Sequence, residues 1–185
     1  MRIISGSLKG KKLNFIKSTT TRPLRDYVKE NIFNILSHSN LLLNLTKDTA
    51  VLDLYSGVGS FGIECISRGA KEATFIEKDF TAEKILRNNL KELGIENKTK
   101  VINENISSYL PKIKKKFNIF FFDPPYADSS YTENIEKIKK LSLYEKNHLI
   151  IVHREKKTND GLEKILKIML IKNYGRSNVI FGVLN

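Results

Sequence analysis

The sequence has no tryptophan, one cysteine and three histidines among its 185 residues. The single cysteine, Cys65, cannot form an internal disulfide, so nothing ties the fold to the oxidising compartments where disulfides persist. The longest apolar runs, such as Leu149–Val152, are far shorter than the ~20 residues that a membrane-spanning helix needs. The basic residue near the start is followed by no long apolar region, which argues against a secretory signal. We therefore expect a cytoplasmic protein with no membrane partner.

Acidic residues are missing from positions 1–25, although the whole chain has 20 of them. The same positions hold seven cations: Arg2, Lys9, Lys11, Lys12, Lys17, Arg22 and Arg25. The formal net charge of +12 favours polyanionic partners, because each cation near a phosphate releases condensed counterions. A bias toward Lys, Asn and Ile would raise the lysine content without any function, but a block of one sign is typical of a binding arm. We predict that this basic arm (residues 1–25) contacts nucleic acid through Lys9, Lys11, Lys12, Arg22 and Arg25.

The front of the chain differs in pattern from the rest. Residues 2–5 and 12–16 are typical of two short strands around a turn, which predicts a small β-hairpin. Pro23 suits the first turn of a helix that runs to about Ser37. The sequence therefore predicts an N-terminal extension over residues 1–48 and a main domain over residues 49–185.

From residue 50 onward, apolar strands alternate with helices. Strands are expected at 50–54, 73–77, 99–103, 117–123 and 148–153, with two more near 165–172 and 178–184. Helices are expected after the first strand to about Arg68, at 80–93 before Gly94, and near 131–142. This alternation predicts an α/β fold with a doubly wound, mostly parallel sheet, in which the last two strands supply one antiparallel element. Such sheets bind ligands beyond the carboxyl ends of their strands.

The glycine loop (residues 57–62) reads G-V-G-S-F-G and matches the spacing G-x-G-x-x-G. It follows a predicted strand and opens a predicted helix, and Glu77 ends the next strand 20 residues after Gly57. Glycines let the backbone approach a ligand, and a carboxylate at this place can accept hydrogen bonds from ribose hydroxyls. NAD and S-adenosylmethionine both carry a ribose, so the spacing alone leaves an NAD-binding oxidoreductase open.

Asp53 lies inside the first strand, four residues before Gly57. A carboxylate there would repel the pyrophosphate of NAD. S-adenosylmethionine has a sulfonium and an ammonium instead, and a nearby carboxylate suits them, either directly or by fixing the amides of the loop. The alternative is that Asp53 only caps local backbone groups. We interpret the loop as a site for S-adenosylmethionine.

The D-P-P-Y turn (Asp123–Tyr126) follows the fourth predicted strand. Its two prolines fix two φ angles and remove two amide donors, which leaves the Asp123 carboxylate and the Pro124 carbonyl as a rigid pair of acceptors. Two acceptors can hold both N–H bonds of an aromatic amine and direct its nitrogen at a methyl donor. Tyr126 offers a ring on which a base can stack. The alternative reading, a simple strand terminator, does not explain why the turn falls beside the glycine loop.

Other polar residues give weaker signals. Asn105 follows the third strand and suits either an adenine contact or the N-cap of the next helix. His148 and His153 flank the fifth strand, and we interpret both as structural or solvated, since no cysteine or carboxylate cluster indicates a metal. We predict no metal site, and we interpret Cys65 as core packing.

With these residues in place, the chain resembles the RsmD family of bacterial methyltransferases, which act on guanine N2 in 16S ribosomal RNA. The likeness covers nearly the whole chain and lies in the segments RIISGSLKGKKL, TRPLRDYVKENIFNIL, VLDLYSGVGSFGIECISRGA, FIEKD and FFFDPPY. The front segment is the specific part, because many methyltransferases share the glycine loop and the D-P-P-Y turn. Leu24 and Arg25 depart from the small polar residues that are commoner after Arg-Pro, and Asn105 stands where Asp is commoner.

The resemblance implies a class I methyltransferase fold, which is Rossmann-like, with S-adenosylmethionine as cofactor and guanine 966 of 16S ribosomal RNA as target. It implies cofactor contacts around the first three strand ends, from Asp53, Tyr55, Ser56, Gly57, Gly59, Glu77, Lys78, Asn105 and Ile106. It also implies capture of the base by Asp123, Pro124 and Tyr126. The expected partner is 16S ribosomal RNA in a small ribosomal subunit or an assembly intermediate, and the expected state is a monomer.

The nearest rival function is a DNA adenine-N6 methyltransferase, which uses the same D-P-P-Y logic. Such enzymes generally need a module that reads base sequence, whereas this chain has only about 50 residues outside the catalytic fold, which favours a substrate specified by RNA shape. A nucleic-acid-binding protein without catalysis is a further alternative. The intact Asp53, Gly57, Gly59 and Asp123 argue against it.

Overall fold

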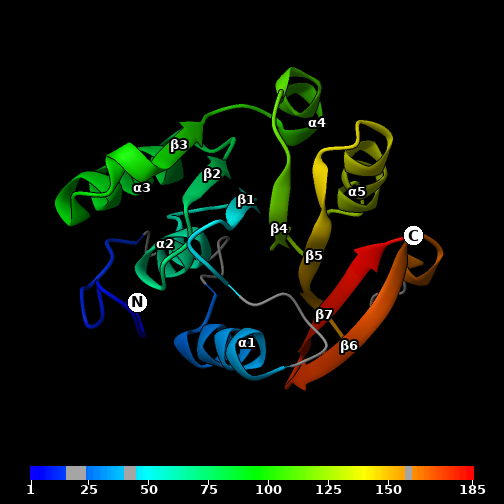
Figure 1. The fold of residues 1–185 in the computed structure, drawn as a ribbon, viewed down its shortest axis with the longest axis horizontal. Coiled ribbons are helices and arrows are strands. Elements are labelled where there is room, and N and C mark those ends of the chain that lie inside the picture. Colours follow the sequence, from blue (N-terminus) through cyan, green and yellow to red (C-terminus); the bar gives the residue numbers. More distant parts are fainter. Residues whose placement is uncertain (16–23, 40–44, 157–159) are drawn as a thin grey trace.

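The computed structural model in Figure 1 describes residues 1–15, 24–39, 45–156 and 160–185. Seven strands form one sheet in the order β3-β2-β1-β4-β5-β7-β6. The strands are β1 Ala50–Leu54, β2 Glu72–Ile76, β3 Thr99–Ile102, β4 Phe117–Phe122, β5 Tyr144–Glu155, β6 Leu166–Tyr174 and β7 Ser177–Leu184. The α-helices are α1 Asp26–His38, α2 Ser60–Ser67, α3 Phe80–Leu93, α4 Ile106–Tyr109 and α5 Tyr131–Lys140, and short 3-10 turns are η1 Glu96–Lys98, η2 Leu110–Lys112 and η3 Leu162–Lys164.

The sheet has the predicted mixture of strand directions. β3, β2, β1, β4 and β5 run parallel to one another. Among the strands in the described residues, only β7 runs the other way, because it pairs antiparallel with both β5 and β6. The α/β fold class with one antiparallel strand is therefore confirmed. The order of the last two strands was not predicted: the last strand in the sequence lies inside the sheet, and β6 forms the edge.

Both faces of the sheet are covered, which explains its continuously apolar strands. Successive residues of a strand point to opposite faces. Val51 and Phe121 accordingly pack with α1, α2 and α3 on one side, and Leu52 and Phe120 pack with α4 and α5 on the other. Figure 1 shows the two groups of helices on either side of the central strands.

The helix predicted at 80–93 is confirmed as α3, and its ends follow from local chemistry. The Asp79 side chain accepts a hydrogen bond from the Ala82 amide at 2.7 Å and so caps the first turn. Gly94 ends the helix with φ of 65°, in the left-handed region that glycine adopts without steric cost.

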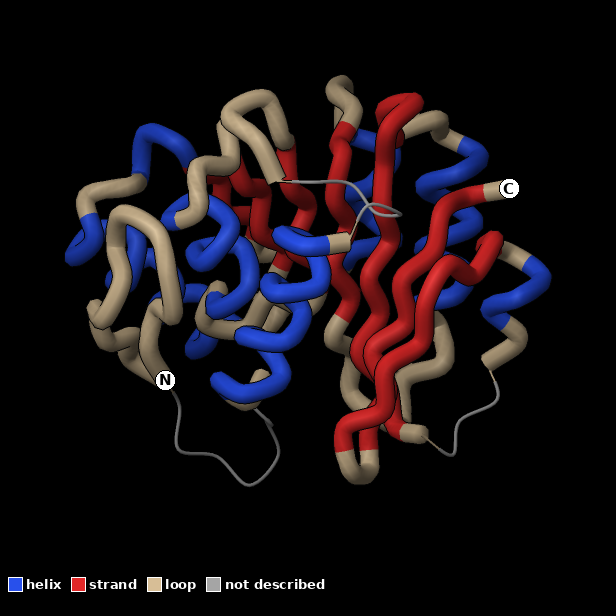
Figure 2. The backbone as a smooth tube through the Cα atoms, turned by 60° about the horizontal axis from the view of Figure 1, so that its bottom comes forward, coloured by secondary structure: helices blue, strands red, loops and turns tan. Residues whose placement is uncertain are grey.

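The predicted N-terminal hairpin is present in the described residues as a short antiparallel pairing rather than as two regular strands. Arg2 and Lys12 form an antiparallel bridge, the Ile3 amide donates to the Lys11 carbonyl at 2.9 Å, and the Gly10 amide donates to the Ile3 carbonyl at 2.9 Å. The amides of Ile4 and Ser5 instead donate to the two oxygens of the Glu64 carboxylate in α2, at 2.8 and 3.0 Å. At these two residues, beyond the paired part of the hairpin, a side chain takes the hydrogen bonds that a longer partner strand would have made. Figure 2 shows this segment beside the helices and away from the β6–β7 hairpin.

The first helix is α1, Asp26–His38, which ends within a residue of the prediction. The predicted start at Pro23 lies outside the described residues, as does part of the predicted strand at 12–16. No helix in the described residues is long and apolar enough to cross a membrane.

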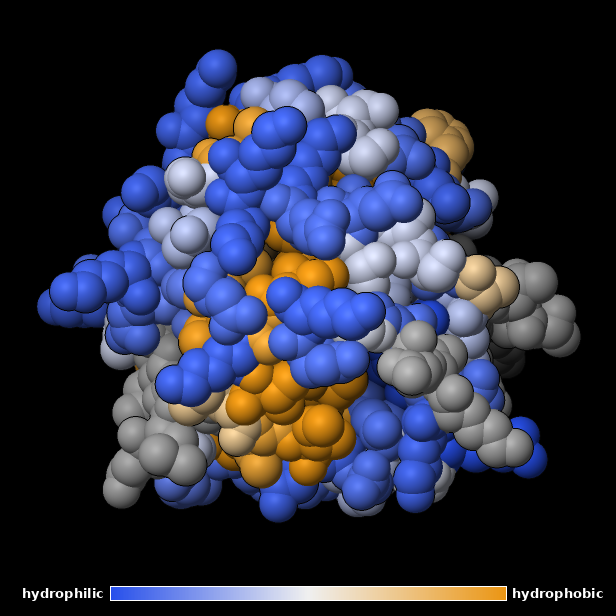
Figure 3. All heavy atoms as spheres, turned by 90° about the vertical axis from the view of Figure 1, so that its right-hand side faces the viewer, coloured by the Kyte–Doolittle hydropathy of each residue, from blue (hydrophilic) through white to orange (hydrophobic). Residues whose placement is uncertain are grey.

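The edge strand β6 carries an apolar surface. Ile171 is 49% exposed, and Figure 3 shows an apolar area among hydrophilic side chains on the side of the molecule where β6 lies. An exposed edge can pair with other chains, and charged side chains and irregular pairing oppose this. β6 has both features, because Lys167 and Lys172 are exposed and the register with β7 shifts between Ile168 and Leu170.

Candidate active site

The three polar segments predicted at strand ends come together at one edge of the sheet. β1 pairs with β2 and β4 in parallel, so Leu54, Ile76 and Phe122 lie at the same level. The residues that follow these strands, including the glycine loop, Glu77 and Asp123, therefore share the carboxyl edge. This is the place where doubly wound sheets bind ligands.

The glycine loop is fixed to the end of β2 by hydrogen bonds. The Gly57 amide donates to the Glu77 carboxylate at 2.7 Å, and the Ser56 amide donates to the Ile76 carbonyl at 3.2 Å. Gly59 has φ of 85°, and a Cβ there would lie 2.4 Å from a methyl carbon of Leu86. Glycine is required at this position for both reasons.

Asp53 anchors the start of α2. Its Oδ2 accepts the Gly62 amide at 2.9 Å, and the residue is only 1% exposed. Burial, together with the negative charges of Asp123 and Glu77, raises the pKa of this carboxyl well above its usual value, while the Gly62 amide acts in the opposite direction. This hydrogen bond fits both roles considered for Asp53, the fixing of loop amides and a local backbone cap, so a role in cofactor binding stays a prediction.

Glu77 is half-buried and accepts two backbone amides, from Gly57 at 2.7 Å and from Asp79 at 2.8 Å. Each carboxylate oxygen has two lone pairs, so the side chain retains capacity for further donors such as ribose hydroxyls. Lys78 is exposed beside it.

Asn105 is the N-cap of α4, because its Oδ1 accepts the Ser107 amide at 2.9 Å. The N-cap reading of this residue is confirmed, and an adenine contact remains a prediction. Ile106 is buried behind it in the core on the α4 and α5 side. The neighbouring Asn103 donates its side-chain amide to the Glu77 carbonyl at 2.8 Å, which ties the end of β3 to the end of β2.

Tyr55 leaves β1 in a left-handed conformation with φ of 59°. Burial is the main cause that raises the pKa of its hydroxyl to about 12, and the negative charge of Asp128 adds to the effect. The side-chain amide of Asn134 in α5 donates to this hydroxyl at 3.3 Å. Tyr55 therefore connects the glycine loop to the segment that follows the D-P-P-Y turn.

The D-P-P-Y turn is fixed by two hydrogen bonds to its Pro125 carbonyl. The Pro125 carbonyl accepts the Asp128 amide at 2.9 Å and an Arg154 Nη1 hydrogen at 3.0 Å. Pro124 is buried, whereas Asp123 and Tyr126 are half-buried. In the part of the chain that the structure describes, no hydrogen bond occupies the Pro124 carbonyl.

Arg154 was missed in the sequence although it holds this turn. It is buried at the end of β5, where its Nε donates to Asp160 at 3.0 Å and its guanidinium lies 4.8 Å from the centre of the Tyr131 ring. The Tyr131 hydroxyl also donates to Asp160, at 2.7 Å. This ion pair compensates the buried charge of Arg154 and keeps the cation beneath the D-P-P-Y turn.

His153 was interpreted as structural or solvated, yet it contacts the predicted catalytic carboxylate. Its Nδ1 lies 2.9 Å from Oδ1 of Asp123. His148, by contrast, is buried and bonds the backbone of Glu145 and Leu184, so the structural interpretation is confirmed for that residue. The sequence contains a signal for His153 and Arg154, because both are polar and directly follow the apolar run 149–152 at the end of a predicted strand. That this strand lies next to β4 is known only from the structure.

The basic arm reaches the glycine loop through Asn89 of α3. This buried side chain accepts the Asn14 amide at 2.8 Å and donates to the carbonyls of Asn14 and Val58, at 3.1 and 3.2 Å. Lys9, Lys11, Lys12 and Arg25 are exposed, and Arg22 lies outside the described residues.

The other end of the arm is anchored by a buried charge cluster. Lys29 of α1 donates to the Arg2 carbonyl at 2.7 Å and to the Ser60 hydroxyl at 3.1 Å, and lies 3.7 Å from Glu64. Burial lowers the pKa of this lysine, and the nearby Glu64 opposes the change. The first residues of the arm, α1 and α2 are therefore packed together.

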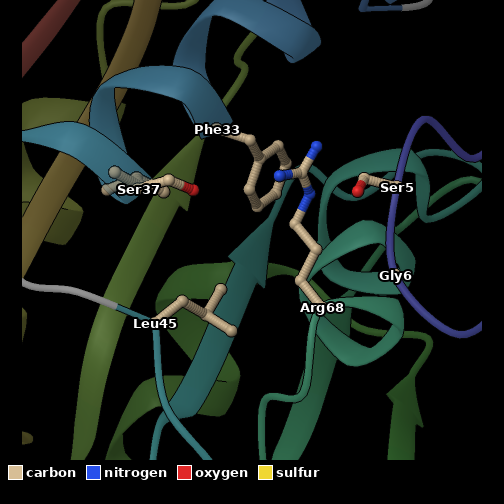
Figure 4. A pocket seen from close by; sticks show the side chains of 7 residues that line it. Ser5, Gly6, Phe33, Ser37, Leu45 and Arg68 are labelled. Atoms are coloured by element: carbon tan, nitrogen blue, oxygen red, sulfur yellow. The ribbon is translucent and has the colours of Figure 1, made fainter.

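A pocket of about 380 Å³ lies away from this edge (Figure 4). Its wall comes from the arm, from α1 and from the residues near the ends of α1 and α2: Ser5, Gly6, Phe33, Leu36, Ser37, Leu45 and Arg68. The guanidinium of Arg68 lies over the Phe33 ring and its Nε donates to Glu64 at 2.8 Å. None of the predicted site residues lines this pocket, because α2 separates it from the glycine loop.

Comparison with known proteins agrees with this geometry. Residues 1–183 match the model of a family described as conserved hypothetical protein 95. Ribosomal RNA small subunit methyltransferase D of Buchnera aphidicola is 35% identical over 156 residues, which cover 84% of this chain and 78% of that protein. The protein of the same name from Haemophilus influenzae is 34% identical over 159 residues, with 84% and 79% covered. A solved structure described as "Putative methyltransferase yhhF from Escherichia coli" is 29% identical with a TM-score of 0.81, over 98% of this chain and 96% of that one.

Proposed function

Because the chain belongs to the RsmD methyltransferase family, described as conserved hypothetical protein 95, we propose that it methylates the exocyclic N2 amine of a guanine in 16S ribosomal RNA. Guanine 966 is the proposed target, on the family resemblance. The observation that supports the chemistry is the position of Asp123 and Pro124, which end the strand next to the one that carries the glycine loop.

The methyl donor is S-adenosylmethionine, the cofactor of the family. We assign the ribose to Glu77 and the amino-acid end of the cofactor to the glycine loop with Tyr55 and Ser56. Asp53 acts indirectly, since it holds the Gly62 amide and adds negative charge near a cationic ligand. Lys78, Asn105 and Ile106 border the proposed adenine pocket. Membership of a methyltransferase family argues against the NAD-dependent alternative, which rested on the glycine spacing and on Glu77.

The proposed reaction is a direct transfer. The guanine amine is a poor nucleophile because its lone pair is delocalised into the ring. The Asp123 carboxylate and the Pro124 carbonyl accept its two N–H bonds, orient the nitrogen toward the methyl group and stabilise the positive charge that develops on it. The cofactor would supply an activated methyl group, whose C–S bond breaks as the N–C bond forms, and the proton released from the amine would pass to water. Tyr126 stacks on the base.

The substrate is held mainly by charge. Lys9, Lys11, Lys12 and Arg25 are exposed, and Asn14 of the same arm is tied to the glycine loop through Asn89, so the arm offers cations for phosphates at a fixed place on the domain. Arg22 belongs to the same proposed surface by its place in the sequence. A small ribosomal subunit or an assembly intermediate presents such phosphates in a fixed shape.

One experiment tests this function. Purified protein is incubated with radiolabelled S-adenosylmethionine and with four substrates: small subunits lacking the modification, naked 16S ribosomal RNA, unmethylated duplex DNA and bulk protein. Label in guanine N2 at a single position of 16S ribosomal RNA is the expected result, and Asp123→Ala is the negative control. Label in DNA adenine would instead support the rival DNA methyltransferase.

A further inference from the structure

His153 lies at the end of β5, beside Asp123 at the end of β4, because Val152 pairs with Phe122 in register. Its Nδ1 is 2.9 Å from Oδ1 of Asp123, and its Nε2 is 2.9 Å from the hydroxyl oxygen of Ser177 in β7. The Ser177 hydroxyl is in turn 3.2 Å from the Tyr174 carbonyl. A line of hydrogen-bonding groups thus runs from the proposed amine acceptor to the β6–β7 turn.

The partners of His153 determine where its protons lie. A carboxylate oxygen only accepts, so Nδ1 carries a hydrogen that it donates to Asp123. Nε2 can accept the Ser177 proton when the ring is neutral. It can also donate to Ser177 when the ring is charged, with the Ser177 hydroxyl turned to the Tyr174 carbonyl. Either arrangement keeps the bond from Nδ1 to Asp123, because the hydroxyl rotates to suit.

We propose that His153 is a positioning residue for methyl transfer, an inference that rests on the proposed function of Asp123. Its Nδ1–H occupies Oδ1 and fixes the rotamer of the carboxylate. The other oxygen, Oδ2, is then left to accept one N–H of the amine while the Pro124 carbonyl accepts the other. A carboxylate that turned freely would reach this geometry in only a fraction of encounters, and the rate would fall with that fraction.

The surroundings of His153 differ from those of a histidine that only stabilises the fold. His148, on the same strand, is 8% exposed and bonds only backbone groups. The side chains of His153 and Asp123 are 12% and 20% exposed, at the rim where a substrate arrives. The Arg154 bond to the Pro125 carbonyl is the counterpart of this contact, so adjacent residues of β5 hold the two ends of the same turn.

The test compares His153→Leu, which removes the donor, with His153→Asn, whose amide places a donor near the position of Nδ1. His153→Leu should lower kcat about tenfold, the effect of losing one hydrogen bond, with KM for the RNA substrate and the affinity for S-adenosylhomocysteine nearly unchanged. His153→Asn should recover most of the lost rate. His148→Gln, with its thermal unfolding recorded beside the others, controls for a general effect of altering a β5 histidine on stability.

A second comparison shows whether His153 acts through Asp123. In an Asp123→Asn background, measured by single turnover, His153→Leu should cause little further loss, because the group that it positions has already been changed. Equal losses in both backgrounds, or a fully active His153→Leu, would overturn the inference. If the wild-type protein transferred no label to RNA, the proposed function itself would be wrong, and this outcome is distinct from a failure of the His153 inference.

Imidazole NMR gives a readout that does not depend on activity: the His153 signal should show a protonated Nδ1 and should shift in Asp123→Asn. The protein has only three histidines to assign.

Discussion

In the proposed reaction, the carboxylate of Asp123 accepts hydrogen bonds from two groups, the amine of the substrate and the imidazole of His153. The prolines that follow it remove the amides that would otherwise compete for the same oxygens. The side chain therefore meets no amide from the two residues that follow it, and His153 of the neighbouring strand β5 contacts its Oδ1.

We predict that Asp123→Ala abolishes most of the methyl transfer and leaves the fold intact. Loss of the charged acceptor should cost about 2–4 kcal/mol of transition-state stabilisation, or about 30- to 1,000-fold in rate. Single-turnover transfer to small subunits measures the rate, and calorimetry with S-adenosylhomocysteine checks that the cofactor site survives. Near-normal turnover would show that the D-P-P-Y turn is only a rigid turn.

Tyr126 is predicted to act through its ring. Tyr126→Ala should weaken capture of the base by about 1–3 kcal/mol, the usual effect of removing a stacking partner. Tyr126→Phe keeps the ring and should be mild. The comparison is made on KM for the RNA substrate, and equal losses in both variants would assign the role to the hydroxyl instead.

At the scale of elements, the basic arm is built into the catalytic domain although its sequence differs from it. Glu64 of α2 binds the amides of Ile4 and Ser5, and Asn89 of α3 binds Asn14. These contacts place exposed lysines at a fixed position relative to the glycine loop.

Reversal of Lys9, Lys11 and Lys12 to Glu should weaken RNA binding and flatten its dependence on salt. Each neutralised phosphate releases a fixed number of counterions, so the slope of log K against log salt measures how many phosphates the protein neutralises. Lys139 and Lys140, exposed at the end of α5, offer a matched control for charge reversal. An unchanged slope in the arm variant would show that the phosphates bind elsewhere.

At the scale of the whole molecule, the protonation of the buried Asp53 bears on the stability of the fold and on the proposed binding of the cofactor. Its folded-state pKa is raised above the ordinary value of 3.8, chiefly by burial. The protonated form is therefore favoured by folding, and the stability that it contributes is lost as pH rises above the ordinary value and through the folded pKa. We propose that the ionised form favours a cationic cofactor, although ionisation removes this contribution to stability.

Asp53→Asn tests this balance, because Asn keeps an acceptor for the Gly62 amide and cannot ionise. The melting temperature of the variant relative to wild type should rise as pH increases above the ordinary value of 3.8 and through the raised folded-state pKa, because wild-type Asp53 then loses its proton at a cost. Affinity for S-adenosylmethionine should fall over the same range. Thermal scans at matched ionic strength measure the first effect, and a difference that stays constant with pH would contradict it.

The sequence by itself determined the elements and the chemistry of the two main segments. Strand and helix periods, the cap at Asp79 and the stop at Gly94 are local, so a short window of residues contains them. The same holds for the glycine loop and the D-P-P-Y turn, whose order along the chain already placed them at one edge of a parallel sheet. The hairpin at the N-terminus is also instructive, since its first residues pair with residues 10–13 as expected, whereas a carboxylate from α2 takes the amides of Ile4 and Ser5.

Only the tertiary structure decided which side chains meet. Asp123 and His153 are 30 residues apart, and their contact depends on the pairing of β4 with β5 and on the place of β7 beside β5. Arg154 reaches the Pro125 carbonyl for the same reason. The apolar pattern of a strand is the same whichever strand lies next to it in the sheet. Hydrogen bonds between strand ends therefore follow from sheet order and register rather than from the sequence period.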